Sequence, residues 1–318
     1  MWSCLLSASL YGDSPPQHDF TFQEASNYPN LPWLTGTLLT PSEVVVPGGH
    51  WNVEPYLAWD IRYGYYDSKW NYHHASQNFY SLISINYLEY GISDYVDVQI
   101  APQFAWNHTS GASQWVLGDL SVIFDFQLLY AVEGKWWPNV KLTVSGDIPI
   151  GKYQHLDPHK KGTDGGGTGS FNPSAGIVFG RVFQLSTFHF FRPRLFMGYT
   201  IPNSVSVKGL NVYGGGVGTK GVVYPSQVLL GLTGLEYTLN PHWVFSLDVQ
   251  YAHKTKQQFK GKTEMTMRAP SSEQWSLAPA VEYNWSENLG LISGVWFSLA
   301  GRNATSFASG ISALNVYF

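Results

Sequence analysis

The chain of 318 residues contains little charge: Lys, Arg, Asp and Glu make up only 13% of it. Soluble domains usually carry about 25% charged residues. A single cysteine, Cys4, excludes an internal disulfide and a zinc cluster built on several cysteines. No run of about 18 apolar residues occurs, so a helical membrane span is excluded. The net charge of −4 argues against a nucleic-acid partner.

Aromatic residues, in contrast, are abundant. They make up 16% of the chain and include 13 Trp, 20 Tyr and 18 Phe, while the mean hydropathy is only −0.12. A transmembrane β-barrel reconciles these values, because each of its strands alternates lipid-facing and lumen-facing residues and averages to a neutral hydropathy.

A period of two begins at residue 49. In residues 51–66 the odd positions are apolar or aromatic, whereas the even positions include Glu54, Asp60 and Arg62. Such alternation predicts a strand with one face toward lipid and one toward water. In residues 77–91 we expect the lipid-facing residues to be Phe79, Ile83, Ile85 and Tyr87, opposite Asn78, Ser84 and Asn86.

The same analysis along the chain gives twelve strands, and the fold class expected is an all-β, antiparallel, up-and-down transmembrane barrel. The connections alternate between short and mostly longer ones, which is typical of periplasmic turns and extracellular loops. The expected periplasmic turns are 93–94, 131–139, 185–187, 240–242 and 286–290. The expected outer loops are 67–76, 107–114, 152–172, 204–225, 254–272 and 301–305.

Three regions are expected. Residues 1–12 resemble the tail of a secretory signal that lacks a basic start, so a truncated signal segment is expected there. Residues 13–48 are proline-rich and predict an irregular periplasmic arm or a plug. Residues 49–318 form the barrel, in which the closing strand, 306–318, pairs with the first and removes open edges. Its final residue, Phe318, resembles the signal by which the barrel-assembly machinery recognises outer-membrane proteins.

Three short motifs resemble a family of bacterial outer-membrane proteins, the MetA-pathway phenol-degradation family. They are VPGGHWNVEP at 46–55, GDL at 118–120 and DIPIGKY at 147–153. The resemblance implies an outer-membrane channel for small, often hydrophobic compounds, without naming the solute.

Charged residues on the predicted inner faces are the candidate solute path. One hypothesis is a constriction with acidic walls and a basic strip at Arg192 and Arg194 that orients a solute. The alternative is a lattice of ion pairs that fills the interior, because an isolated buried charge is costly. The candidate residues are Glu54, Asp60, Arg62, Asp97, Asp125, Lys141, Asp147, Arg192, Arg194, Asp248 and Glu282.

The function expected is passive diffusion of small, hydrophobic or aromatic solutes through the outer membrane. The alternatives are a barrel that does not transport but binds a surface partner through its loops, and a soluble β protein. No spacing singles out a catalytic triad, so no enzyme, cofactor or metal site is expected. Expected partners are outer-membrane lipid, the solute and lipopolysaccharide, whose phosphates would meet loop lysines such as Lys260 and Lys262.

Overall fold

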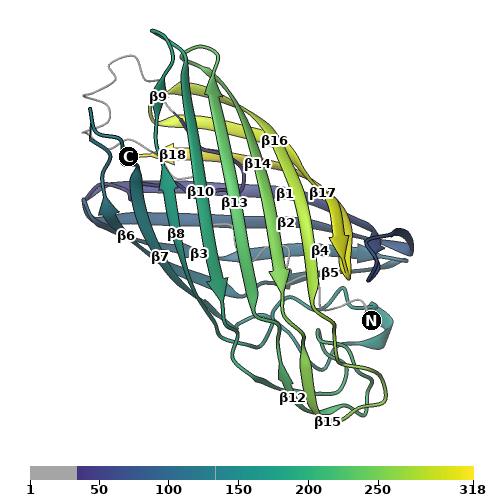
Figure 1. Cartoon of the computed structure of the whole chain (residues 1–318). Coiled ribbons are helices and arrows are strands. Elements are labelled where there is room, and N and C mark those ends of the chain that lie inside the picture. The colour runs from purple at the N-terminus through teal and green to yellow at the C-terminus, as the bar shows by residue number, and fades with distance from the viewer. Residues whose placement is uncertain (1–33, 133) are drawn as a thin grey trace.

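The computed structural model describes residues 34–132 and 134–318. Regular structure in this part is almost entirely β-strand, together with the 3-10 turn η1 (Pro158–Lys160). No helix in these residues is long and apolar enough to cross a bilayer. Ten segments each form a complete strand of one antiparallel barrel (Figure 1): β1 (Trp51–Tyr66), β2 (Tyr72–Ser93), β7 (Asn139–Ile148), β8 (Asn172–Gly180), β10 (Phe190–Thr200), β13 (Val228–Thr238), β14 (Trp243–Lys254), β16 (Ser272–Ser286), β17 (Leu289–Arg302) and β18 (Ala304–Tyr317).

Four further segments make two interrupted strands. β3 (Val96–Ala101) and β4 (Gln103–Thr109) both pair with β2 and are separated by Pro102, which lacks an N–H for the ladder. β5 (Ala112–Leu117) and β6 (Leu120–Leu129) continue one another across Gly118 and Asp119. The barrel therefore has twelve strands, which confirms the predicted fold class.

The barrel closes through β1, which pairs with β2 on one side and with β18 on the other. Leu57, for example, lies opposite Ser84 of β2 and Ser312 of β18. The expected pairing of the last strand with the first is confirmed. Closure leaves neither terminal strand with an open edge.

The expected alternation is present in most strands. On β1 the odd residues Leu57 and Trp59 are 52% and 42% exposed on the outer surface, while Asp60 and Arg62 are buried inside. Arg181 lies just beyond the end of β8, outside the alternation of that strand, and donates to the carbonyl of Trp137.

The prediction for β2 was wrong. Phe79, Ile83, Ile85 and Tyr87 are buried inside the barrel, and Ser84 and Asn86 belong to the opposite face. Both faces of this strand carry apolar residues, so hydrophobicity alone did not identify the outer face. Ile83, Ile85 and Tyr87 pack in the interior beside Tyr56 and Ala105, within an apolar cluster.

The longer connections gather at one end of the barrel and form a separate small sheet (Figure 1). Its strands are β11 (Val205–Lys208), β12 (Lys220–Tyr224) and β15 (Gln258–Lys262), and we call it the cap sheet. It covers an apolar cluster of Leu156, Val205, Val207, Val212, Tyr213, Val223, Phe259 and Met267. At the opposite end, the short β9 (Phe183–Gln184) pairs with the start of β10.

Candidate functional site in the barrel interior

The described chain before β1 runs inside the barrel. Residues 34–46 are all buried, and we call residues 34–48 the inner segment. It forms no strand, so its backbone amides need other hydrogen-bond partners. The signal expected at 1–12 and the first part of the arm, 13–33, lie outside the described residues.

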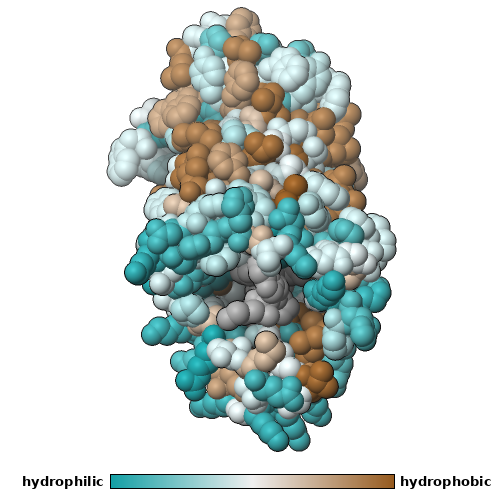
Figure 2. All heavy atoms as spheres, turned by 90° about the vertical axis from the view of Figure 1, so that its right-hand side faces the viewer, coloured by the Kyte–Doolittle hydropathy of each residue, from teal (hydrophilic) through white to brown (hydrophobic). Residues whose placement is uncertain are grey.

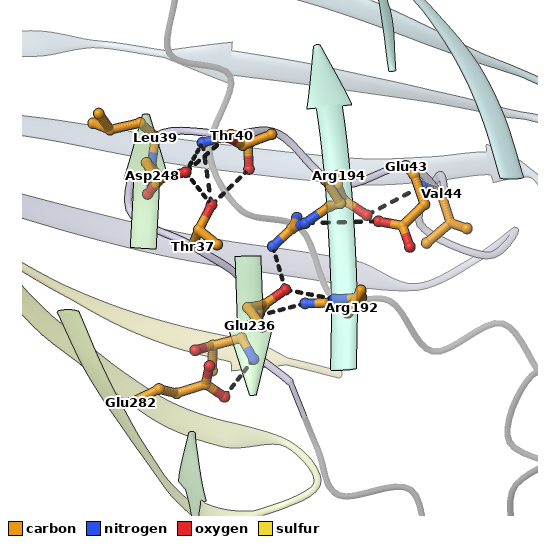
Figure 3. Close-up of polar contacts among 12 residues, drawn as sticks. Thr37, Leu39, Thr40, Glu43, Val44, Arg192, Arg194, Glu236, Asp248 and Glu282 are labelled. Carbon is orange, nitrogen blue, oxygen red and sulfur yellow. Dashed lines mark hydrogen bonds and ion pairs between the residues drawn. The ribbon is translucent and has the colours of Figure 1, made fainter. Parts of the chain in front are cut away.

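Asp248 of β14 is the principal anchor of the inner segment (Figure 3). Its Oδ1 accepts hydrogen bonds from Thr37 Oγ1 at 2.6 Å, Thr40 Oγ1 at 2.7 Å and the Thr40 amide at 3.1 Å. Its Oδ2 accepts one from the Leu39 amide at 3.2 Å. One carboxylate of the barrel wall thus accepts hydrogen bonds from two hydroxyls and two amides within residues 37–40 of the inner segment.

Side chains from other strands hold the rest of it. The Thr35 amide donates to Glu282 Oε1 at 2.6 Å, and the Val46 amide donates to Asp97 Oδ2 at 3.0 Å. The Val45 amide donates to Gln127 Oε1 at 3.0 Å. Because these acceptors come from β16, β3 and β6, the inner segment crosses the lumen and narrows it.

The two arginines of the predicted basic strip are engaged by carboxylates. Glu236 of β13 accepts two bonds from Arg192, at Nε (2.5 Å) and Nη2 (2.7 Å), and one from Arg194 Nη2 at 2.8 Å. Arg194 Nε also lies 3.8 Å from Glu43 Oε2 of the inner segment (Figure 3). Two cations and two anions meet here, so much of the positive charge is neutralised within the wall. A role in orienting a solute stays a prediction.

Asp97, Asp125 and Lys141 meet a residue that the sequence analysis did not select, Glu89. Carboxylate oxygens of Glu89, Asp97 and Asp125 lie within 4.8 Å of one another. Lys141 Nζ is 2.9 Å from Asp125 Oδ2, and Gln99 Nε2 donates to both Glu89 and Asp125. Glu89 was missed because the alternation of β2 was assigned to the wrong faces.

The remaining candidates also point inward. Glu54 accepts from Asn52 Nδ2 at 3.0 Å and from Asn315, and Asp147 accepts from Ser121 Oγ at 2.6 Å. Arg62 donates from Nε to Asp60 Oδ2 at 3.0 Å. All eleven predicted residues are therefore buried in the interior, although they form several local groups rather than one site.

A cavity of about 190 Å³ lies between the barrel interior and the cap end; we call it the vestibule. Strand residues that line it include Arg62, Gln250, Ser276, Trp296 and Phe307, and Tyr213 contributes from the region of the cap sheet. Only Arg62 among them was predicted from the sequence. Neutral serines, glutamines and single aromatic rings give no sequence signal. The other lining residues could therefore be identified only from their position around the cavity in the folded barrel.

No protein-family model and no curated protein sequence matches this chain. Among solved structures, the COG4313 outer membrane channel from Pseudomonas putida F1 superposes with a TM-score of 0.69 at 13% identity, covering 87% of this chain and 98% of that chain. The β domain of the Bordetella autotransporter BrkA gives 0.45 at 12% identity over 85% and 99%. The CymD monoaromatic hydrocarbon channel gives 0.38 at 10% identity over 86% and 88%.

At these identities a likeness establishes fold rather than function, and only the first superposition is close. It confirms the fold that the motif resemblance implied. The chain therefore has the fold of the COG4313 outer membrane channel: a twelve-stranded barrel.

Proposed function

We propose that this protein is an outer-membrane channel that lets small, hydrophobic or aromatic solutes cross by passive diffusion. The observation that carries the proposal is the distribution of charge in the barrel: its outer face is apolar, its charged side chains point inside, and the interior leads into the vestibule. A soluble barrel would have the reverse distribution, with its apolar residues inside.

The outer surface supports a location in a bilayer. Figure 2 shows apolar residues spread over the barrel wall, with hydrophilic residues gathered toward the cap end. Aromatic rings suited to a membrane interface lie at the other end. There Trp51 and Trp243 are each 43% exposed; Trp51 lies tilted against Tyr90 and Trp243 packs edge-on against Tyr283, with centroids 4.7 Å apart in both pairs. The strands are also long enough, since a membrane strand needs about 9–11 residues.

The interior supports passage that is restricted by the inner segment. The lumen enclosed by twelve strands is intermediate in width. It is wider than that of eight-stranded barrels, which side chains fill, and narrower than that of the larger porins. The inner segment occupies part of this lumen, so the free path is narrow. The vestibule, with Trp296 and Phe307 on its wall, suits a small solute with an apolar body.

Liposome swelling with the purified full chain tests transport. Vesicles that contain the protein should swell in neutral aromatic solutes, such as benzyl alcohol derivatives, and in small sugars, and the swelling rate should differ between these two classes of solute. Both swelling rates should rise when residues 34–43 are deleted. Vesicles without protein are the control. Absence of swelling for both forms, in vesicles shown to contain folded barrel, would overturn the proposal.

The cap sheet is the proposed contact with lipopolysaccharide. Lys208 of β11, Lys220 of β12 and Lys262 of β15 lie directly opposite one another in register, and all three are exposed. Like charges in such cross-strand pairs are destabilising unless a counter-charge meets them. Phosphate groups of the lipopolysaccharide core supply that charge. Replacing the three lysines with glutamine should weaken co-purification of lipopolysaccharide, whereas Lys69→Gln in another loop should not.

A barrel that binds a surface partner without transport is the second candidate. The cap sheet favours it, because this sheet has its own apolar cluster and could present a stable binding surface. Planar-bilayer conductance separates the two functions, since a barrel of this second kind would pass no current even without residues 34–43. The expected recognition of β18 by the assembly machinery stays a prediction.

A further inference from the structure

The vestibule differs in charge from the rest of the interior. Among the described residues, twelve carboxylate side chains but only four cationic ones are buried. Yet among the described residues the charged ones that line the vestibule are two cations, Arg62 and Lys254, and none of the described carboxylates lines it. An acidic lumen therefore opens at the cap end into a pocket whose lining is positive.

Arg62 has unused hydrogen-bonding capacity. Its Nε donates to Asp60 Oδ2 at 3.0 Å, and the guanidinium makes no other hydrogen bond to the described residues. The residue is 5% exposed, and Nη2 is buried without a partner. A guanidinium offers five N–H donors, and a buried charged donor that stays unpaired costs free energy. Because Nη2 is enclosed, Nη1 is the donor that a ligand oxygen in the vestibule can reach.

Aromatic rings flank Arg62 on both neighbouring strands. Its register partners are Phe79 on β2 and Phe307 on β18, and its Cζ lies 5.4 Å from the centre of the Phe79 ring. Phe307 packs edge-on against Trp296 with centroids 4.6 Å apart. The Trp296 indole N–H is already used, because it donates to Ser276 Oγ at 2.8 Å. These rings therefore offer apolar surface rather than further polar contacts.

We propose that the vestibule binds a small amphiphilic carboxylate, an aryl-alkyl acid, with its carboxylate on Arg62 and its apolar body against Trp296 and Phe307. The inference rests on the proposed function and names the solute class for it. Arg–carboxylate pairs are strong, directional contacts. Asp60 offsets part of the charge of Arg62, and Lys254 is a second cation on the lining of the cavity. A neutral hydrocarbon would leave Nη1 unpaired, and an ammonium would be repelled.

Calorimetric titration of the full chain in detergent tests this assignment with three probes of one shape: phenylacetate, 2-phenylethanol and 2-phenylethylammonium. Phenylacetate should bind at least tenfold more tightly than the alcohol, and the ammonium should bind most weakly. Equal affinities for the three probes would overturn the proposal.

Two sets of variants locate the site. Arg62→Gln combined with Asp60→Asn removes the ion pair together, so that no buried charge is left alone, and should abolish the preference for phenylacetate. Lys254→Gln should reduce that preference several-fold. Lys256→Gln, at an exposed position that does not line the vestibule, should leave it unchanged.

Folding and transport are measured separately. Heat-modifiable electrophoretic mobility reports the folded barrel. If the double variant does not fold, Phe307→Leu and Lys254→Gln decide, because both must weaken phenylacetate binding. Swelling in neutral aromatic solutes without a carboxylate preference would overturn only this inference. Carboxylate binding without any permeation would instead overturn the proposed channel and leave the binding site standing.

Discussion

Asp119 Oδ2 accepts two hydrogen bonds from Thr168, one from its amide and one from its hydroxyl, each 2.7 Å long. Asp119 Oδ1 accepts a third from the Gly151 amide at 3.0 Å. Two of the motifs that carry the family resemblance, GDL and DIPIGKY, therefore meet through this carboxylate. It holds the connection 149–171 against the interrupted strand β5–β6, where β5 pairs with no described strand but β4.

Asp119→Ala should release that connection. Three hydrogen bonds to one buried carboxylate are lost, and bonds to charged groups contribute about 1.5–3 kcal/mol each. The local free energy of opening should fall by roughly 2 kcal/mol or more, which hydrogen exchange over residues 149–171 measures. Asp157→Ala, an exposed cap of η1 in the same connection, is the matched control. Unchanged exchange in Asp119→Ala would contradict the assigned anchor.

Asp248→Ala should widen the ion path. It removes four hydrogen bonds to the inner segment, so residues 37–40 lose their anchor on β14. Single-channel conductance in planar bilayers should rise above that of the unmodified protein. Ser246→Ala, two residues earlier on the same inner face, should leave conductance as it was. Equal conductance in all three proteins would mean that Asp248 does not hold the constriction.

A charge on the outer face should block assembly in a bilayer. Leu247 of β14 lies on that face, and an arginine near the bilayer midplane costs about 2–4 kcal/mol. Leu247→Arg should therefore lower the folded fraction in lipid vesicles. Leu185→Arg, in the short turn before β10 where the leucine is 61% exposed, should fold normally. The same loss for both would argue against a lipid-facing wall.

The Asp67 carboxylate should titrate below its ordinary range. The hydrogen bond with His73 lowers its pKa most, and the Asn71 and Lys69 amides lower it further. Because the folded-state pKa is depressed, the favourable contribution to the turn is complete above about pH 4 and is lost only as the pH falls through the lower folded value. Carbon-13 titration of Asp67 measures this.

His73→Ala is the matched variant for that titration. It removes the principal cause, so the pKa of Asp67 should move up toward the ordinary value of about 3.9. Substituting His159, which does not contact Asp67, should not move it. A titration midpoint that stays the same in His73→Ala would show that the imidazole does not set the pKa.

The alternation of polar and apolar residues along each strand predicted most of the barrel. A strand repeats every two residues, so the polarity of neighbours such as Leu57 and Asp60 is enough to assign inner and outer faces without knowing their partners. This logic placed all eleven candidate residues in the interior. It failed on β2, where apolar residues occupy both faces and Tyr87 packs inside against Tyr56.

Only the tertiary structure determined the hydrogen-bond and ion-pair partners of those residues. Residues 34–48 show no periodicity, so nothing local indicates that Thr40 binds Asp248 or that Glu43 approaches Arg194. The vestibule likewise depends on barrel closure, which brings Arg62 of β1 beside Phe307 of β18. On every strand whose polarity alternates clearly, the sequence by itself determined which side chains face the lumen, because facing is a property of a single strand. Only the closed barrel determined their partners, because hydrogen bonds and ion pairs join strands that are distant in the chain.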